Sequence, residues 1–257
     1  MLNTAQNIGV VFAIVAGSLA FLWVLRRVWP NEERRAHNDL IGWQVTVLGT
    51  TYAVILGFML YTVWSNFQLA DSNVEGEANC LVNLARSAVG LSSSDRQQIQ
   101  GLAQEYVEVM LNEEWSAMNR SEVTTHSHDV IQRLWSAVMR SQAHSASEQT
   151  SLDHAISELS EMTKHRRLRD LEVVSALPGV LWAVLIVGAV VTIVSACLFG
   201  SGDARLQLIQ VIMLAALLSL ILVAIADINR PFQGSVHVSP AAFERARAAI
   251  ADIRALH

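Results

Sequence analysis

Charged residues are scarce in this chain of 257 residues. Asp, Glu, Lys and Arg make up 16% of it, whereas a typical soluble domain carries about 25%. The deficit is concentrated in four apolar stretches, at about residues 8–25, 45–64, 179–199 and 207–226. Each is about as long as a helix that crosses the hydrocarbon core of a bilayer, which takes roughly 20 residues. The sequence therefore predicts a membrane protein with four spanning helices in contact with the lipid bilayer.

The chain lacks the basic residues that open a cleavable signal peptide. Its first basic residues, Arg26 and Arg27, follow the first apolar stretch instead of preceding it. This order is typical of a retained membrane helix. Cysteine is scarce too, and the two thiols, Cys80 and Cys197, are far apart in the sequence. Such a pair indicates neither a disulfide framework nor a metal-binding set.

The motifs of common enzyme families are also missing. The sequence has no HExxH, P-loop, GxSxG or CxxC pattern, so we expect no enzymatic activity and no cofactor. His126, His128 and Asp129 have metal-ligand chemistry, but we interpret them as part of a solvated turn before a helix. The four apolar stretches contain no charged residue, which disfavours a proton-coupled transporter or pump.

A polar segment, about residues 68–175, separates the second and third apolar stretches. Ser94 with Gln97, and Ser145 with Glu148, have the spacing of a capping box, in which the two side chains bond each other's backbone amides. Apolar residues at helical spacing follow each pair. We therefore expect a helical bundle here.

The polar segment is acidic, with 16 Asp and Glu against 9 Lys and Arg. A nucleic-acid partner is not expected, because phosphate binding needs clustered positive charge. The segment nevertheless ends in a basic cluster, which we interpret as an anchor for lipid headgroups. The cluster consists of Lys164, Arg166, Arg167 and Arg169.

The order of these segments predicts an all-α fold in four parts. Residues 1–67 contain membrane helices 1 and 2, and residues 68–177 form a helical extramembrane domain. Residues 178–228 contain membrane helices 3 and 4, and residues 229–257 form a tail with a short amphipathic helix.

Membrane helix 2 carries small residues at every fourth position, Gly49, Ala53 and Gly57. Residues four apart lie on the same side of a helix, so these three form one stripe. Small-residue stripes allow helix backbones to approach closely in lipid. We expect this stripe to pack against neighbouring helices.

A second stripe on membrane helix 2 is semi-polar and lies on roughly the opposite face. It consists of Thr51, Ile55, Phe58 and Thr62, spaced 4, 3 and 4 residues apart. In an oligomer this face fits a pore whose apolar constriction, at Ile55 and Phe58, gates by excluding water. The alternative is ordinary packing on both faces, because threonine in a membrane helix can bond its own backbone.

The tail has an unusually distinctive sequence for a segment that leaves a membrane. In "NRPFQGSVHVSPAAF", Pro231 fixes the chain direction, Phe232 is an apolar anchor and Gly234 permits a turn. Ser239 and Pro240 have the pattern of a helix start. We hypothesise that the tail folds back and docks on the helical domain of its own or a neighbouring subunit. The alternative is a helix that lies on the lipid surface.

Five segments together resemble the bacterial bestrophin-like membrane proteins. The resemblance extends from about residue 8 to residue 245, and the tail motif is its most specific part. The segments are "RRAHND", "YAVILGFMLYTVWSNF", "EGEANCLVNLAR", "LPGVLWAVLIVGAVVT" and "RPFQGSVHVSPAAF". One position departs from the family pattern, because Asn229 stands where an acid usually precedes "RPF" and the nearest acid is Asp227.

A more distant similarity is to the bestrophin channels themselves. They share "LGF" in helix 2, a following "LVN..R" stretch, and a "PF.G" turn after the last membrane helix. The matching residues are Leu56, Gly57 and Phe58; Leu81, Val82, Asn83 and Arg86; and Pro231, Phe232 and Gly234.

The resemblance implies a homo-oligomeric ion channel of the bacterial inner membrane. Bestrophins are pentamers that pass small inorganic ions, mostly anions, and their helical domain is cytoplasmic. The Lys and Arg residues flanking the membrane helices number five on each side, so charge does not decide the orientation. The sequence therefore favours a passive channel. The alternative is a non-conducting scaffold or sensor that recruits a partner through its acidic helical domain.

Overall fold

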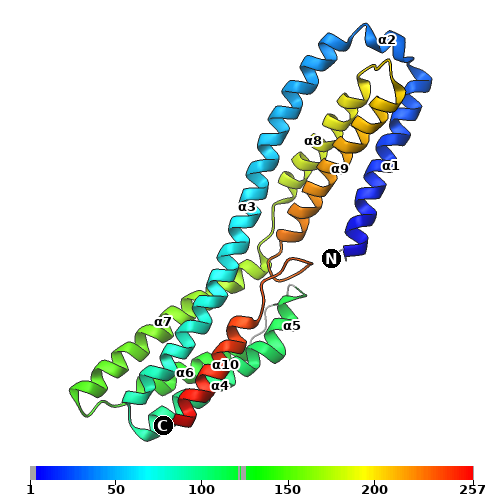
Figure 1. The fold of residues 1–257 in the computed structure, drawn as a ribbon. Coiled ribbons are helices and arrows are strands. Elements are labelled where there is room, and N and C mark those ends of the chain that lie inside the picture. Colours follow the sequence, from blue (N-terminus) through cyan, green and yellow to red (C-terminus); the bar gives the residue numbers. More distant parts are fainter. Residues whose placement is uncertain (1–3, 121, 123–125, 257) are drawn as a thin grey trace. The chain divides into compact units, whose positions relative to one another are not determined.

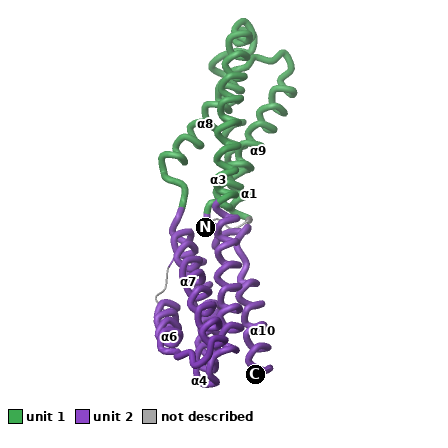
Figure 2. Tube along the Cα trace, turned by 90° about the vertical axis from the view of Figure 1, so that its left-hand side faces the viewer, with its two compact units in different colours: residues 1–65, 176–229 green, residues 66–175, 230–257 purple. Residues whose placement is uncertain are grey.

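The computed structural model describes residues 4–120, 122 and 126–256. The chain divides into two compact units, which Figure 2 colours separately. Residues 1–65 and 176–229 form the first, which we call the membrane unit, and residues 66–175 and 230–257 form the second, the helical unit. Across the described residues the fold is all-α, with four helices long and apolar enough to cross a membrane. The predicted fold class is confirmed, including the helices between the second and third spans.

The membrane unit consists of long apolar helices that lie side by side (Figure 1). Their bounds are α1 Thr4–Val28, α3 Asn38–Ser87, α8 Gly179–Leu198 and α9 Ala204–Ile228, with the short α2 Asn31–Arg35 between the first two. The part of α3 after Ser65 belongs to the helical unit. Pro178 precedes α8, a position where its missing N–H leaves no donor unpaired. Asp203 caps α9 by accepting a 2.8 Å hydrogen bond from the Arg205 amide.

Within the membrane unit, α3 packs through one face. Tyr52, Leu56 and Val63 lie on this face and are buried. The Tyr52 hydroxyl donates a 2.6 Å hydrogen bond to the Leu185 carbonyl of α8. Gly188 lies against the tyrosine ring, where any side chain would collide with it. Because an unpaired hydroxyl is costly in an apolar medium, this bond holds α3 at a fixed position beside α8.

Side chains of the "RRAHND" segment join the two helical hairpins of the membrane unit. Arg34 is fully buried and donates a 2.7 Å bond to the Cys197 carbonyl, at the negative end of the α8 dipole. Asn38 exchanges two bonds with the Gly200 backbone, one of 2.7 Å to its oxygen and one of 2.9 Å from its nitrogen. A Cβ at Gly200 would lie 2.6 Å from the Arg35 backbone nitrogen, so this approach requires glycine.

The helical unit packs several amphipathic helices around the last part of α3. Its apolar interior includes Leu81 and Leu84 of α3, and Ile99, Leu134 and Leu159 from three other helices, all fully buried. The additional elements are α4 Ser93–Val109, the π-helical turn η2 Met110–Glu114, α5 Trp115–Met118, α6 His126–Arg140, α7 Ala146–Val174 and α10 Ala241–Leu256, after the short 3-10 turn η1 Ala88–Gly90.

The predicted capping boxes have different outcomes. Ser145 caps α7, where its hydroxyl accepts a 3.1 Å bond from the Glu148 amide, as the sequence predicts. The reciprocal bond differs from the prediction, because the Glu148 carboxylate accepts from the His144 amide at 2.6 Å and not from the Ser145 amide. The prediction at Ser94 is wrong, because Ser92 caps α4 and accepts a 3.2 Å bond from the Asp95 amide. An acid in the first turn of a helix also interacts favourably with the helix dipole, which a neutral glutamine does not.

Candidate functional site

The small-residue stripe of α3 faces away from the packed interior of the membrane unit. Among the described residues, no heavy atom lies within 4 Å of a Cβ built on Gly49 or Gly57, apart from their own helix. Ala53, between them, is exposed. Beside Gly57 the surface has a hollow of about 370 Å³, which Tyr61 and Trp64 also line. The stripe therefore offers a close-approach surface that the described part of the chain does not cover.

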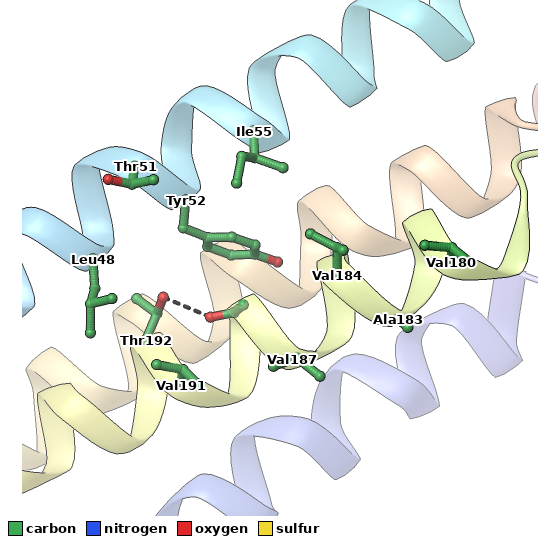
Figure 3. Close-up of a pocket in the computed structure, with 11 residues that line it drawn as sticks. Leu48, Thr51, Tyr52, Ile55, Val180, Ala183, Val184, Val187, Val191 and Thr192 are labelled. Atoms are coloured by element: carbon green, nitrogen blue, oxygen red, sulfur yellow. Dashed lines mark hydrogen bonds between the residues drawn. The ribbon is translucent and has the colours of Figure 1, made fainter.

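The semi-polar stripe divides into two halves. Thr51 and Ile55 line a groove of about 450 Å³ between α3 and α8, whose opposite wall includes Val184 and Val191 (Figure 3). In the same figure, the hydroxyl of Thr192 points back to its own helix, where it donates to the Gly188 carbonyl at 2.7 Å. The groove wall is therefore almost wholly apolar.

The other half of the semi-polar stripe projects from the chain. Phe58 is 65% exposed and Thr62 is exposed as well. The Thr62 hydroxyl donates a 2.8 Å bond to the Phe58 carbonyl, as threonines often do in membrane helices. The two predicted stripes have average directions about 170° apart at 100° per residue, and they flank the packed face on its two sides.

A buried charge cluster lies in the helical unit. Arg169 of α7 is 1% exposed and donates to Glu77 of α3 at 2.7 Å and to Glu114 of η2 at 3.2 Å. The Tyr106 hydroxyl donates to the other oxygen of Glu77. Asp170 lies 3.4 Å from the same guanidinium. The cluster thus ties three elements together through one cation.

Burial and charge attraction oppose each other in this cluster: burial raises the pKa of Glu77, against the effects of Arg169 and Tyr106. Burial lowers the pKa of the Arg169 guanidinium, but Glu77 and the other nearby acids more than offset this, so the pKa stands well above its ordinary value. Burial raises the pKa of Asp170, although Arg169 and Arg166 act in the opposite direction. Removal of the arginine would leave buried carboxylates without their counterion.

This cluster corrects the interpretation of the basic segment before α8. Arg169 faces the interior of the helical unit, and Arg166 donates to the Ser127 hydroxyl at 2.9 and 3.1 Å. Lys164 is exposed and pairs with Glu161 at 2.9 Å. The basic segment Lys164, Arg166, Arg167 and Arg169 as a whole is therefore not a headgroup anchor, because Arg166 and Arg169 bond to side chains within the helical unit.

The sequence contained a signal for the buried charge cluster of Arg169 and Glu77, which the interpretation of the basic segment as a lipid anchor missed. The buried stripe of α7 advances by alternating steps of three and four residues, and Arg169 falls in that register after Leu159 and Met162. Glu77 falls in the register of the buried stripe of α3, between Val74 and Leu81. When a charged residue occupies a position in the buried stripe of one helix, and a residue of opposite charge occupies one in the buried stripe of another helix, the two indicate an internal ion pair.

A half-buried carboxylate, Glu172, lies nearby in the helical unit. Glu172 accepts a 2.9 Å bond from Asn73, and the other side of the Asn73 amide meets His165 at 3.0 Å. The second oxygen of Glu172 is buried and has no hydrogen-bond partner among the described residues. Burial raises the pKa of Glu172 to about 7, against smaller opposing effects of Asn73 and Arg169.

The three predicted docking residues of the tail lie in one loop of the helical unit. Pro231 is buried, and its carbonyl accepts a 2.8 Å bond from the Val238 amide, which closes the loop. Phe232 is 4% exposed and meets the ring of Trp115 edge-on, with centroids 6.1 Å apart. Gly234 has φ 88°, a conformation that disfavours other residues. The following helix α10 buries Phe243 against the same core.

The residues considered for a metal site make other contacts. Nδ1 of His126 lies 2.6 Å from a carboxylate oxygen of Glu113, and both side chains are more than half exposed. Glu113 raises the pKa of His126 through the hydrogen bond and through its charge. His128 lies 3.5 Å from the side chain of Gln132, one turn further along α6.

The fold and the apolar helices define a multi-pass, all-α membrane protein with a helical domain between its second and third spans. The chain matches the family of the Bestrophin-like domain over residues 12–243, and it belongs to that family. The resemblance inferred from the sequence is thereby confirmed. No curated protein matches the chain.

Solved structures of similar fold include bacterial bestrophin homologs. A point variant of a bacterial bestrophin homolog from Klebsiella pneumoniae is 11% identical, with a TM-score of 0.72 over 97% of this chain and 99% of that chain. Another variant from the same organism is 10% identical, with a TM-score of 0.69 over 96% and 98% of the two chains. A structure described as a membrane protein variant is 12% identical, with a TM-score of 0.72 over 96% and 98%. At these identities the likeness is one of fold.

Proposed function

We propose that this protein is a homo-oligomeric, passive ion channel of the bacterial inner membrane, with α3 of each subunit lining the pore. The observation that carries this proposal is the environment of α3. Both of its predicted stripes flank the packed face, and the small-residue stripe has no partner among the described residues of the chain. Membership of the Bestrophin-like family supports the same function.

Several copies of α3 around an axis account for both stripes. Gly49, Ala53 and Gly57 pack against a neighbouring subunit, because small residues let backbones approach closely. Thr51, Ile55, Phe58 and Thr62 face the lumen. By the family resemblance the oligomer is a pentamer and the helical domain is cytoplasmic.

Phe58 carries the constriction in this arrangement. It is the more exposed of the two apolar residues in the stripe, at 65%, whereas Ile55 partly faces the groove beside α8. A ring of phenylalanines excludes water from a narrow passage and thereby blocks ions. No catalytic step is required of any residue, and the permeant ions are small inorganic ions, mostly anions by the resemblance.

The four-part organisation belongs to the same proposal. Residues 1–67 and 178–228 form the conducting part, and residues 68–177 form the extramembrane domain. The tail, residues 229–257, docks through Pro231, Phe232 and Gly234. The contact between Phe232 and Trp115 supports docking on the helical unit of the same chain.

Ion flux through purified protein in liposomes tests the proposal. We expect wild type to conduct and Phe58→Ala to conduct faster, because the smaller side chain lets water through the constriction. Ile55→Ala should have a smaller effect in the same direction. Ile209→Ala is the matched control, since Ile209 is 53% exposed on α9, which does not line the pore in this arrangement. Equal flux from all four proteins, or none with any ion, contradicts the proposal.

The second candidate function is a non-conducting scaffold or sensor. It is favoured by a polar surface groove of about 600 Å³ between α4 and α6, lined by residues that include Gln97, Glu105 and Arg133. A partner would bind there or elsewhere on the acidic helical unit. Absence of flux from an intact oligomer would favour this function.

A further inference from the structure

A second groove in the membrane unit lies away from the predicted pore-lining stripe. It has a volume of about 380 Å³ and is enclosed by α1, α8 and α9. Its floor includes Ala189, Ile193 and Leu218, which are 6–8% exposed. Ile186 and Val190, each 54% exposed, form its outer edge. The groove is therefore a crevice within one chain that opens to the surroundings of the helices.

The polar side chains of this groove gather at one end. Asn7 lies in the first turn of α1 and Trp182 in the first turn of α8, while Ala226 lies in the last turn of α9. Tryptophan and other amphipathic side chains favour the headgroup level of a membrane. Ser219, deeper in the groove, already donates a 3.0 Å bond to its own helix at Ala216. The groove thus has a polar mouth and an apolar interior.

Its length matches one leaflet of a bilayer. Along α8 the lining runs from Trp182 to Ile193, which at 1.5 Å per residue is about 16 Å. The hydrocarbon core of a membrane is about 30 Å thick, so a single leaflet is about 15 Å deep. The groove begins at the ends of the helices and reaches Leu218, about 15 Å from the end of α9, and Ile193 of α8.

The surroundings of the groove select its occupant. Below the mouth its lining is apolar, and it opens to the surroundings of helices long and apolar enough to cross a membrane, where acyl chains are at hand. A helix, about 10 Å across, is too wide to enter a groove of about 380 Å³ as a whole. Water is a poor occupant because it needs two to four polar partners, which the interior lacks.

We propose that this groove binds one acyl chain of a phospholipid from the leaflet at the α8 N-terminus. The chain lies along Ile186, Ile193 and Leu218, and its ester group lies at the mouth beside Asn7 and Trp182. The lipid fills the space between three helices of one subunit. This site does not depend on ion conduction, so it stands even where the channel function fails.

Photolabelling of the full-length protein tests the site. The protein is reconstituted in phosphatidylethanolamine and phosphatidylglycerol vesicles that contain a phospholipid with a diazirine near its acyl terminus. Labelled residues are then identified by mass spectrometry. We expect the buried floor residues Ile193 and Leu218 to be labelled at least as strongly as Met213 of the same unit. Met213 is 66% exposed and lies outside the groove, so it reports ordinary contact with bulk lipid.

A variant that fills the mouth makes the test specific. Ala226→Phe adds a ring at an exposed position, so the fold should tolerate it. Labelling of Ile193 and Leu218 should fall about tenfold, a ratio typical of one steric misfit, while labelling of Met213 stays constant. Ala189→Phe, on the floor, should act in the same way.

Two results overturn the proposal. One is labelling of the floor residues far below that of Met213 in wild type, which means that no acyl chain enters. The other is labelling that Ala226→Phe leaves unchanged in a protein of normal thermal stability. A groove covered by a neighbouring subunit would give the first result, together with a change of oligomer mass in Ala226→Phe.

Discussion

Arg169 is the residue whose loss should destabilise the helical unit most. It is buried between Glu77 and Glu114, and it has Asp170 at 3.4 Å. Arg169→Met should lower the free energy of unfolding by about 3–5 kcal/mol, because it leaves buried carboxylates unpaired. Chemical unfolding of the full-length protein in detergent, followed by circular dichroism, measures the loss.

The matched control for Arg169 lies on the same helix. Lys164 pairs with Glu161 in the open, with both side chains at least half exposed. Lys164→Met should cost about 0–1 kcal/mol. If Arg169→Met and Lys164→Met lower the free energy of unfolding by the same amount, the buried cluster does not hold its helices together.

Glu172 should make stability depend on pH in the neutral range. Burial raises its pKa from 4.5 to about 7 in the folded protein, so the folded state binds a proton that the unfolded state has lost. The stability due to this group is fully present below about pH 4.5 and is lost as the pH rises through about 7. We expect the unfolding temperature to fall between pH 5 and pH 8.

Glu172→Gln isolates that dependence. The amide keeps the shape of the protonated acid and does not titrate. The unfolding temperature of this variant should therefore decline less than that of wild type between pH 5 and pH 8, and should be the higher of the two at pH 8. Asp170 remains in place, and its raised pKa supplies residual pH dependence. An unchanged slope in Glu172→Gln would exclude the Glu172 carboxyl as its source.

At the scale of elements, the sequence predicted the membrane helices well. The apolar stretches at 8–25 and 207–226 lie within α1 and α9, because length and hydropathy alone define a spanning helix. Helix starts were harder, since three consecutive serines, Ser92 to Ser94, stand at the start of α4 and each has a polar residue three positions on. Ser92 caps the helix because its partner, Asp95, is charged.

The packed face of α3 could not be predicted from the pattern. In a membrane helix apolar residues face lipid and interior alike, so hydropathy does not distinguish Leu56, which is buried, from Val54, which is exposed. What distinguishes them is Tyr52, whose ring fits against Gly188 and whose hydroxyl bonds α8. That pair lies 136 residues apart in the sequence, beyond any periodicity.

The tail is the element whose docking can be tested by one substitution. Phe232→Ala removes a ring that packs edge-on against Trp115 in the core of the helical unit. Truncation of a buried phenylalanine costs about 3–5 kcal/mol, so the unfolding temperature should fall and the tail should become sensitive to protease. Val236→Ala, at a position 41% exposed in the same loop, is the control. Equal stability of both variants with wild type would mean that the tail is not docked.

At the scale of the whole molecule, the proposed channel function rests on an assembly of several chains. The sequence supplied both stripes of α3 and the family resemblance, and the structure shows which face of α3 the chain itself uses. In the proposed oligomer, subunits around a common axis give the other two flanks of α3 their roles. A symmetric interface of small residues and a lumen of Thr, Ile and Phe satisfy both flanks together.

The most direct test of this account is the reaction of α3 cysteines with a membrane-impermeant thiol reagent in liposomes. Cys80 and Cys197 are first replaced by serine and alanine, and single cysteines are then introduced as Phe58→Cys, Thr62→Cys and Leu60→Cys. Leu60 is 37% exposed and lies on the side of the small-residue stripe, about 160° from Phe58 at 100° per residue. Because the reagent reacts only in water, the account predicts modification of Phe58→Cys and Thr62→Cys but not of Leu60→Cys. Protection of all three positions in an intact oligomer would contradict the claim that α3 lines a water-filled pore.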